Sequence, residues 1–153
     1  MAQCPISNPP TAAEWQYSKS FHGHLGPWLS LGMRVGLEAM ERTAARSYFG
    51  VTVHVVCPLS PPHSCLIDGL QLSTGATSGK QNMVAAESES IEVFVTNRDT
   101  EESVTVRVLA STGGLFSHWY RDLGEEEAAR KVWDVPLDTL CEFVAIGEAG
   151  NAG

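Results

Sequence analysis

The stretch SIEVFVTNRDTEESVTVRVLA, residues 90–110, contains the clearest strand signal in the chain. Two runs rich in β-branched residues, 90–97 and 103–110, alternate apolar and polar side chains on either side of the polar link RDTEE. Alternation with a period of two is typical of strands that bury one face, and a short link joins antiparallel neighbours. The stretch therefore predicts a β-hairpin, and with it an antiparallel sheet.

Two more strands are expected in this sheet. The segment VTVHVVCP, 51–58, alternates in the same way and ends at a proline, with His54 on the face opposite to Val53 and Val55. We expect His54 to be a surface residue. The segment DVPLDTLCEFVAI, 134–146, predicts a turn followed by a last strand that carries Cys141 inside.

A long helix is predicted over about 27–46, because apolar residues recur at helical spacing after Pro27, which suits the first helical position. Shorter helices are expected around 13–20 and over 63–73. The acidic run GEEEAARKVW, 124–133, has glutamates first and basic residues last, which favours a solvated helix. The predicted fold is α+β, with an antiparallel sheet packed against the long helix and shorter helices.

The 153 residues suffice for about one domain, and a hydrophobic content of 43% is in the globular range. We expect an irregular arm over 1–14, a core domain over 15–147 and a tail over 148–153. The longest apolar runs are far shorter than the roughly 20 residues of a membrane-spanning helix. The sequence thus predicts a single domain that does not cross a membrane.

Charge and cysteine usage narrow the class of function. A net charge of -8, with no cluster of basic residues, argues against binding to nucleic acid. The start of the chain lacks the basic and apolar regions of a secretory signal, so we expect a cytoplasmic protein. The four cysteines form no CxxC pair, which favours reduced thiols over disulfides.

The segment FHGHLGPW, 21–28, places His22 and His24 on either side of a glycine. Residues two apart point in different directions on a helix, but they can face one way in a loop. Pro27 fixes a helix start just beyond the pair and so leaves both histidines in the loop. Neutral imidazoles are common ligands of zinc and related metals. A metal-binding pair is one reading, and a capping plus a surface histidine is the other.

The segment PPHSCLIDGLQ, 61–71, places Cys65 in the first turn of a helix, where backbone N–H groups lower a thiol's pKa and favour the thiolate. Asp68 follows at i+3 on the same face, and His63 stands two residues before the cysteine. These residues suit a metal or nucleophile site. A small buried cysteine with an exposed aspartate is the alternative.

The loop TGATSGK, 74–80, is not a phosphate-binding P-loop, because the glycines are too close together and Gln81 replaces the hydroxyl residue that holds magnesium. It suits either an anion-binding nest of backbone N–H groups or a tight turn. No serine lies in a GxSxG nucleophile elbow, and the sequence assigns no catalytic residue.

Taken together, FHGHLGPWLSLGMR and CLIDGLQLSTGATSGKQN resemble the FmdE family, which is named for one of the subunits of formylmethanofuran dehydrogenase. The family pattern runs roughly FHGHxCPGxxxG, then CxxDaxQxxTGCTxGKxN. The matching residues in this sequence are Phe21, His22, Gly23, His24, Pro27 and Gly32, then Cys65, Asp68, Gln71, Thr74, Gly75, Thr77, Gly79, Lys80 and Asn82.

The resemblance implies an α+β core, a homodimer, and a metal held where the HGH segment meets the later cysteine. His22, His24 and Cys65 are then the expected ligands, with His63 or Asp68 as a further ligand or as support. Zinc is the expected divalent metal, and nickel and iron remain open. The glycine-rich loop is expected to contact an anion or substrate through Thr74, Gly75, Thr77, Gly79, Lys80 and Asn82.

Two positions depart from the family pattern. Gly26 and Ala76 stand where the family usually has cysteines, so two soft ligands or redox thiols are missing. The ligand set that remains consists of two imidazoles and one thiolate, with Asp68 or His63 beside them.

Two functions follow from the resemblance and the residues. The first is a metal-binding protein accessory to molybdenum or tungsten enzyme metabolism. The alternative is a stand-alone enzyme that uses metal-bound water or Cys65 on a small anionic molecule, with Lys80 and its loop holding the anionic group. A purely structural, partner-binding domain is a third reading. An open coordination position with a pocket beside Cys65 favours the enzyme.

Overall fold

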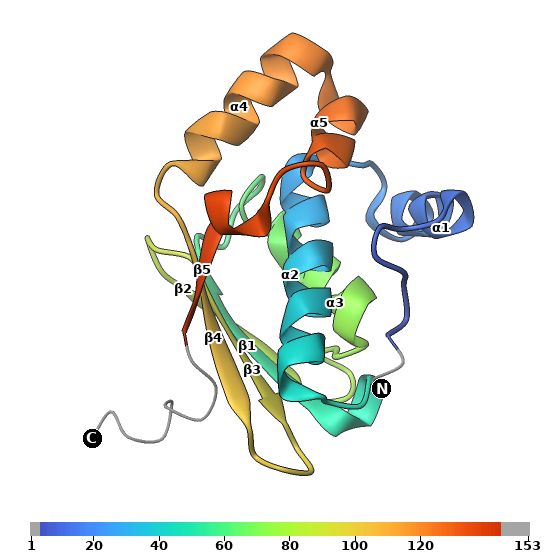
Figure 1. The fold of residues 1–153 in the computed structure, drawn as a ribbon, viewed down its shortest axis with the longest axis vertical. Coiled ribbons are helices and arrows are strands. Elements are labelled where there is room, and N and C mark those ends of the chain that lie inside the picture. Colours follow the sequence, from blue (N-terminus) through green and yellow to red (C-terminus); the bar gives the residue numbers. More distant parts are fainter. Residues whose placement is uncertain (1–3, 145–153) are drawn as a thin grey trace.

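The computed structural model describes residues 4–144, and they form the predicted α+β fold (Figure 1). In chain order the elements are α1 (Ala12–His22), α2 (Pro27–Thr43), a 3-10 turn (Tyr48–Gly50), β1 (Val51–Cys57), α3 (Cys65–Thr74), β2 (Met83–Glu87), β3 (Glu92–Asn97), β4 (Ser103–Val108), α4 (Thr112–Leu123), α5 (Glu125–Lys131), a second 3-10 turn (Leu137–Thr139) and β5 (Cys141–Val144). The tail expected over 148–153 and the last two residues of the segment 134–146 lie outside the described residues.

The five strands form one sheet in the order β2-β1-β3-β4-β5. The predicted hairpin is confirmed: β3 and β4 pair antiparallel, with Val93 opposite Val106 and Val95 opposite Val104. The pairs β1–β3 and β4–β5 are also antiparallel. The sheet is mixed, because β2, which was not predicted, pairs parallel with β1.

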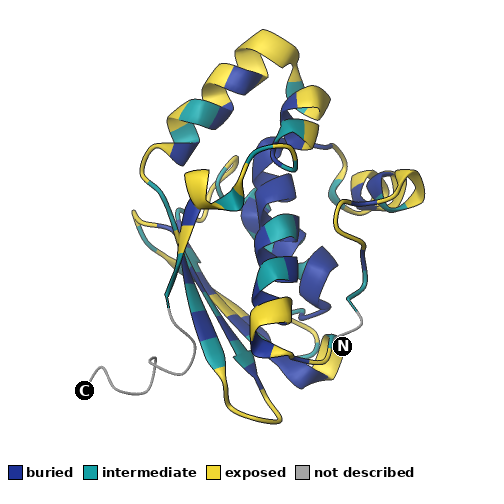
Figure 2. Cartoon of the chain, viewed as in Figure 1, coloured by how far each residue is buried: buried dark blue, intermediate teal, exposed yellow. Residues whose placement is uncertain are grey.

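The core lies between one face of the sheet and α2, as the band of buried residues in Figure 2 shows. Valines on alternate positions of β1, β3 and β4 point into it, whereas His54 on the opposite face of β1 is exposed as expected. Cys141 is 1% exposed, which confirms its predicted place inside β5. All four cysteines are free.

Helices α2 and α3 pack unusually close together because glycines line their contact. A Cβ at Gly32 would lie 2.1 Å from the carbonyl oxygen of Leu66, and one at Gly69 would lie 2.2 Å from that of Leu29. Any larger residue at either position would force the helices apart. This contact fixes the start of α3, where Cys65 lies, beside the start of α2.

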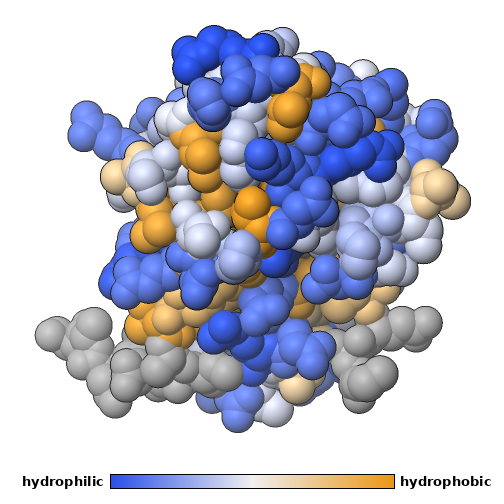
Figure 3. All heavy atoms as spheres, turned by 45° about the horizontal axis from the view of Figure 1, so that its top comes forward, coloured by the Kyte–Doolittle hydropathy of each residue, from blue (hydrophilic) through white to orange (hydrophobic). Residues whose placement is uncertain are grey.

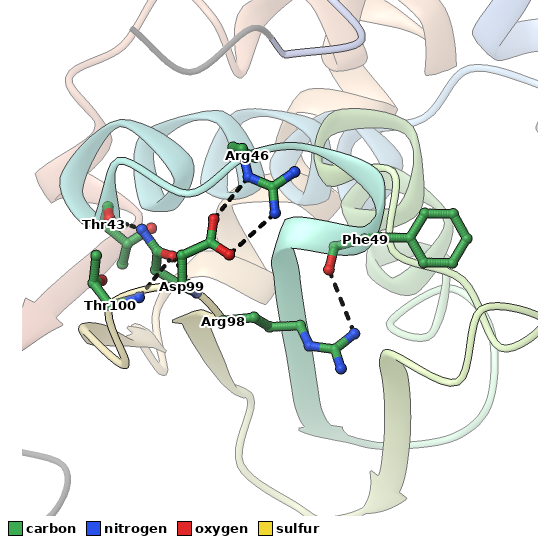
Figure 4. A network of polar contacts seen from close by, with 7 residues as sticks. Thr43, Arg46, Phe49, Arg98, Asp99 and Thr100 are labelled. Carbon is green, nitrogen blue, oxygen red and sulfur yellow. Dashed lines mark hydrogen bonds and ion pairs between the residues drawn. The ribbon is translucent and has the colours of Figure 1, made fainter.

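Helix α2 begins at Pro27 as predicted but ends at Thr43, three residues earlier than the predicted end at 46. Ala44 takes the left-handed conformation, with φ 52°, and terminates the helix. Figure 4 shows the network that fixes this end of the fold: Asn97 donates to the carbonyl oxygen of Thr43 at 2.8 Å, and Arg46 binds Asp99 at 2.7 Å. The turn of the β3–β4 hairpin is therefore anchored to the end of α2.

Helices α1 and α5 are tied together at the opposite end of the molecule. The rings of Trp15 and Trp133 meet edge to face with centroids 6.2 Å apart, and the Arg130 guanidinium lies 5.2 Å from the centroid of the Trp15 ring. Lys19 on α1 forms an ion pair of 2.5 Å with Glu126 on α5. These contacts hold α5 over the segment that follows α1.

Helix α4 was not predicted, and α5 is shorter than the helix expected over 124–133. The two helices form a hairpin around Gly124 at the end of the molecule drawn uppermost in Figure 1. Within residues 4–144, none of the helices combines the length and the apolar character that a bilayer crossing requires.

Candidate metal site

The HGH segment lies at the end of α1, partly in the helix. The prediction that both histidines lie in a loop is wrong for His22, which is the last residue of α1. Gly23 follows in the left-handed conformation, with φ 102°, and its N–H donates to the carbonyl oxygen of Lys19. A glycine takes this conformation at little cost, and the chain turns sharply there. His24 lies beyond the turn, so the two imidazoles can still face one another.

The structure brings the three predicted ligands together. The ligand atoms of His22, His24 and Cys65 all lie within 4.8 Å of one another, and they form the cluster in residues 4–144 that could hold a metal ion. The two imidazole rings have centroids 4.5 Å apart. Three ligands from α1, the following loop and the start of α3 thus converge on one point.

Asp68 holds the ring of His22 in place. Its Oδ2 lies 2.6 Å from Nδ1 of His22, whose side chain is only 8% exposed. The other ring nitrogen, Nε2, is buried and has no hydrogen-bond partner among the described residues. A buried polar atom without a partner is costly, and a metal ion would satisfy this one. A carboxylate on Nδ1 is also the usual support of a histidine that binds metal through Nε2.

Glu125 plays the corresponding part for His24. Its Oε1 contacts Nδ1 of His24 from the first residue of α5, which leaves Nε2 available for a metal. The interpretation of the acidic run as a purely solvated helix is therefore wrong for Glu125. The contact spans 101 positions of the chain, and nothing in the local sequence distinguishes Glu125 from Glu126 or Glu127.

The surroundings of Cys65 differ from the prediction. Burial, followed by the nearby carboxylates of Asp68 and Glu125, raises the pKa of the Cys65 thiol, and a backbone hydrogen bond lowers it only in part. The prediction that the helix start lowers this pKa is wrong, because desolvation and the two carboxylates outweigh the backbone hydrogen bond that favours the thiolate. A metal ion, rather than the helix, would have to favour the thiolate.

A pocket of about 430 Å³ opens beside the cluster. His24, Cys65 and Glu125 line one part of it. The remaining lining consists mainly of apolar side chains from the start of α2, the segment before α3, and α4: Pro27, Trp28, Leu29, Pro62 and Phe116, with Gly26, Ser117, Tyr120 and Arg121 completing it.

The two positions that lack the family cysteines lie in different places. Gly26 lines the pocket, and a Cβ there would lie 3.5 Å from Oε1 of Glu125 and 3.8 Å from Nδ1 of His24. A thiol at 26 would therefore lie close to the cluster. Ala76 is fully buried two residues beyond the far end of α3, whose 10 residues span roughly 15 Å at 1.5 Å per residue. A thiol at 76 would not reach the cluster.

His63 does not join the cluster. Its ring packs against the indole of Trp28, with centroids 4.9 Å apart, and it lines a different pocket. Asp68 also supplies no atom to the cluster and contacts it through His22.

The glycine-rich loop lies at the far end of α3 from Cys65. Thr74 and Asn82 are buried: Thr74 bonds to the carbonyl oxygen of Leu70, and Asn82 donates to those of Tyr48 and Val51. Lys80 lines a separate pocket of about 310 Å³ together with Gly75 and Thr77, whose hydroxyl lies 3.3 Å from its Nζ. Gly79 is exposed. The loop therefore faces a different pocket from that of Cys65, and its contact with an anion or substrate stays a prediction.

Residues 21–147 match the family described as FmdE, Molybdenum formylmethanofuran dehydrogenase operon. The match includes both segments that build the cluster, and the chain belongs to the FmdE family.

The fold is also that of a solved structure, an FmdE-like protein from Syntrophus aciditrophicus whose name refers to a tungsten formylmethanofuran dehydrogenase. The TM-score is 0.57 at 21% identity, and the likeness covers 86% of this chain and 70% of that one. A probable S-adenosyl-L-methionine-binding protein of Archaeoglobus fulgidus is 29% identical over 94 residues, which are 61% of this chain. The matched segment is 26% of that relative, so the likeness spans about a quarter of its length.

Proposed function

We propose that this FmdE-family protein binds a divalent metal ion, with zinc as the expected metal, through Nε2 of His22, Nε2 of His24 and Sγ of Cys65. The observation that carries the proposal is the buried Nε2 of His22, which has no partner in the described part of the chain while Asp68 occupies Nδ1. Two imidazoles and a thiolate suit borderline metals such as zinc.

The proposed site has three protein ligands and a fourth position that faces the pocket. Glu125 and Asp68 keep the two imidazoles in the tautomer that presents Nε2 and fix the orientation of the rings. When bound, the metal would act as a Lewis acid toward a ligand at the fourth position. Its double positive charge would also offset the burial and the carboxylates that disfavour the Cys65 thiolate.

The biological role that we propose is that of a metal-binding protein accessory to molybdenum or tungsten enzyme metabolism. Support comes from the description of the family, which refers to a molybdenum enzyme operon, and from the tungsten enzyme in the name of the Syntrophus protein. In line with the family resemblance, we also propose a homodimer. Light scattering at micromolar concentration tests the pairing, and the mass of a single chain would contradict it.

A stand-alone enzyme remains the second candidate, and the pocket beside Cys65 and His24 is the observation that favours it. In that case the anionic group of a substrate would not reach Lys80 from the metal, because Lys80 lines a separate pocket near the other end of α3. Residues of the first pocket would have to hold the substrate.

Substitution with cobalt(II) tests the ligand set directly. Cobalt bound by a thiolate and two imidazoles in a four-coordinate site gives visible absorption with a sulfur-to-metal charge-transfer band. We expect this band in the wild-type protein and its loss in Cys65→Ser, whereas Cys57→Ser, which alters a buried thiol of β1, retains it. A wild-type spectrum of octahedral cobalt without the band would overturn the proposed site.

A further inference from the structure

We propose that the pocket beside the cluster takes a small carboxylate with an apolar, ring-sized body, whose carboxylate completes the coordination of the metal. The inference rests on the proposed metal site and adds the chemical class of the ligand.

The walls of the pocket suit an apolar body. Pro27, Trp28 and Leu29 come from the first turn of α2, and Pro62 and Phe116 close the pocket from the other elements. The Phe116 and Trp28 rings meet edge to face with centroids 5.0 Å apart, so this aromatic wall is fixed. At the roughly 30 Å³ that a water molecule occupies in the liquid, the volume equals about fourteen waters, enough for one ring with a short substituent.

The walls stay open to solvent along one side. Figure 3 turns the end of the molecule that carries α4 and α5 toward the reader, and apolar residues lie uncovered there among hydrophilic ones. On α4, Ser117 and Tyr120 line the pocket and are both exposed. A small molecule can therefore enter from this side without any part of the core being opened.

Charge in the lining favours an anionic head group. Arg121 lines the pocket and makes no hydrogen bond or ion pair with any residue in the described part of the chain. The carboxylate of Glu125 is already engaged by His24, and that of Asp68 by His22. Arg121 and the metal are then the positive groups that a ligand would meet, and a carboxylate pairs with both.

Gly26 leaves room for that head group at the metal end of the pocket. Its backbone is extended, with φ -139° and ψ 169°, a conformation that any residue adopts. A Cβ at this position would make only ordinary contacts with Glu125 and His24. The absence of a side chain at 26 is therefore not required by the backbone, and it keeps the space beside Glu125 and His24 open.

Three probe molecules separate the parts of the inference. Phenylacetate has a ring and a carboxylate, phenylacetamide has the ring without the charge, and acetate has the charge without the ring. Each is titrated into cobalt-loaded protein while the visible spectrum and the heat of binding are recorded. We expect phenylacetate to bind at least tenfold more tightly than either control, to change the cobalt spectrum, and to bind at least tenfold more weakly to metal-free protein.

Two pairs of variants test the place of binding. Ser117→Phe fills the pocket from α4, whereas His118→Phe adds the same ring at the next residue, which does not line the pocket and contacts Asp122. Arg121→Gln removes the pocket cation, whereas Arg107→Gln removes one that pairs with Glu92 on β3. We expect the phenylacetate affinity of Ser117→Phe and Arg121→Gln to fall at least tenfold, while both variants keep their full cobalt content. Both control variants should bind phenylacetate as the wild type does.

The outcomes separate this inference from the function on which it rests. A protein that takes up no cobalt overturns the metal site and the inference together. Full cobalt uptake with phenylacetate binding no better than phenylacetamide or acetate overturns the inference alone. Wild-type affinity in both Ser117→Phe and Arg121→Gln also overturns it, because the ligand would then bind elsewhere.

Discussion

Asp68 on α3 holds His22 on α1 through a contact of 2.6 Å between Oδ2 and Nδ1, across 46 positions of the chain. The contact joins two helices and leaves the buried Nε2 of His22 without a partner among the described residues, in a ring whose centroid lies 4.5 Å from that of His24. The close packing of α2 and α3 through Gly32 and Gly69 places α3 where Asp68 can make this contact.

Asp68→Asn should weaken metal binding about 10- to 100-fold, because the amide no longer supports the basicity of the imidazole. Titration with zinc in competition with a chelator measures the affinity. Asp122→Asn is the matched control, since Asp122 is exposed on α4 and contacts the surface residue His118. Equal affinities in the two variants would show that Asp68 does not support a metal ligand.

Glu125→Gln should weaken zinc binding by a similar factor through His24. Because His24 is half exposed, with 50% of its side chain accessible, we expect the loss to be no larger than that in Asp68→Asn. Glu127→Gln changes the same charge in the same helical turn, away from the pocket lining, and it should leave the affinity unchanged. An equal loss in the Glu127 variant would indicate a general effect of charge.

Gly26→Cys should convert the site from three protein ligands to four. A Cβ fits at this position, and the added thiol would lie close to the cluster. We expect tighter binding of zinc and a second sulfur in the cobalt charge-transfer spectrum, together with loss of phenylacetate binding. Gly26→Ala fits the same space without a ligand atom and separates the effect of bulk from that of coordination. Unchanged spectra in the cysteine variant would place the metal elsewhere.

The sequence predicted most of the sheet because buried residues alternate with less buried ones in β1, β3 and β4, which gives each strand a period of two. The segment of β2 does not alternate: its burial pattern is one buried residue followed by mostly exposed ones at the sheet edge. It pairs with β1 in parallel, a partnership that the sequence of β2 does not indicate. Helix α4 starts at TGG, and glycines weaken a helix prediction.

The ligands could be predicted because histidine and cysteine have specific chemistry and their spacing matches a family pattern. Their supports were less accessible to sequence analysis. Asp68 has a definite position relative to Cys65 on one helix. Glu125 contacts His24 from α5, whose place depends on packing against α2 and α4 as well as on the contacts with α1. The direction in which the Cys65 pKa shifts likewise depends on burial, and the position of the residue in its helix does not reveal how deeply it is buried.

The stability of the fold should fall at alkaline pH in part through Cys141. Burial raises the pKa of the Cys141 thiol to about 12. A thiol whose pKa is raised by folding stabilises the folded state fully below its unfolded pKa, about 8.5, and loses this contribution as the pH rises toward 12. Between pH 8 and pH 10.5, wild type should lose on the order of 2 kcal/mol more unfolding free energy than Cys141→Ala. Equal losses in urea denaturation would contradict this.

The central claim is that His22, His24 and Cys65 bind one metal ion, and metal content per chain tests it most directly. Untagged wild-type protein is compared by elemental analysis with His22→Ala, His24→Ala and Cys65→Ala, each checked for folding by circular dichroism. His54→Ala, His118→Ala, Cys4→Ala and Cys141→Ala serve as controls, because these four residues lie outside the cluster. We predict close to one zinc ion per wild-type and control chain, and loss of most of the metal in each of the three cluster variants. Full metal content in folded His22→Ala, His24→Ala and Cys65→Ala alike would contradict the proposed site.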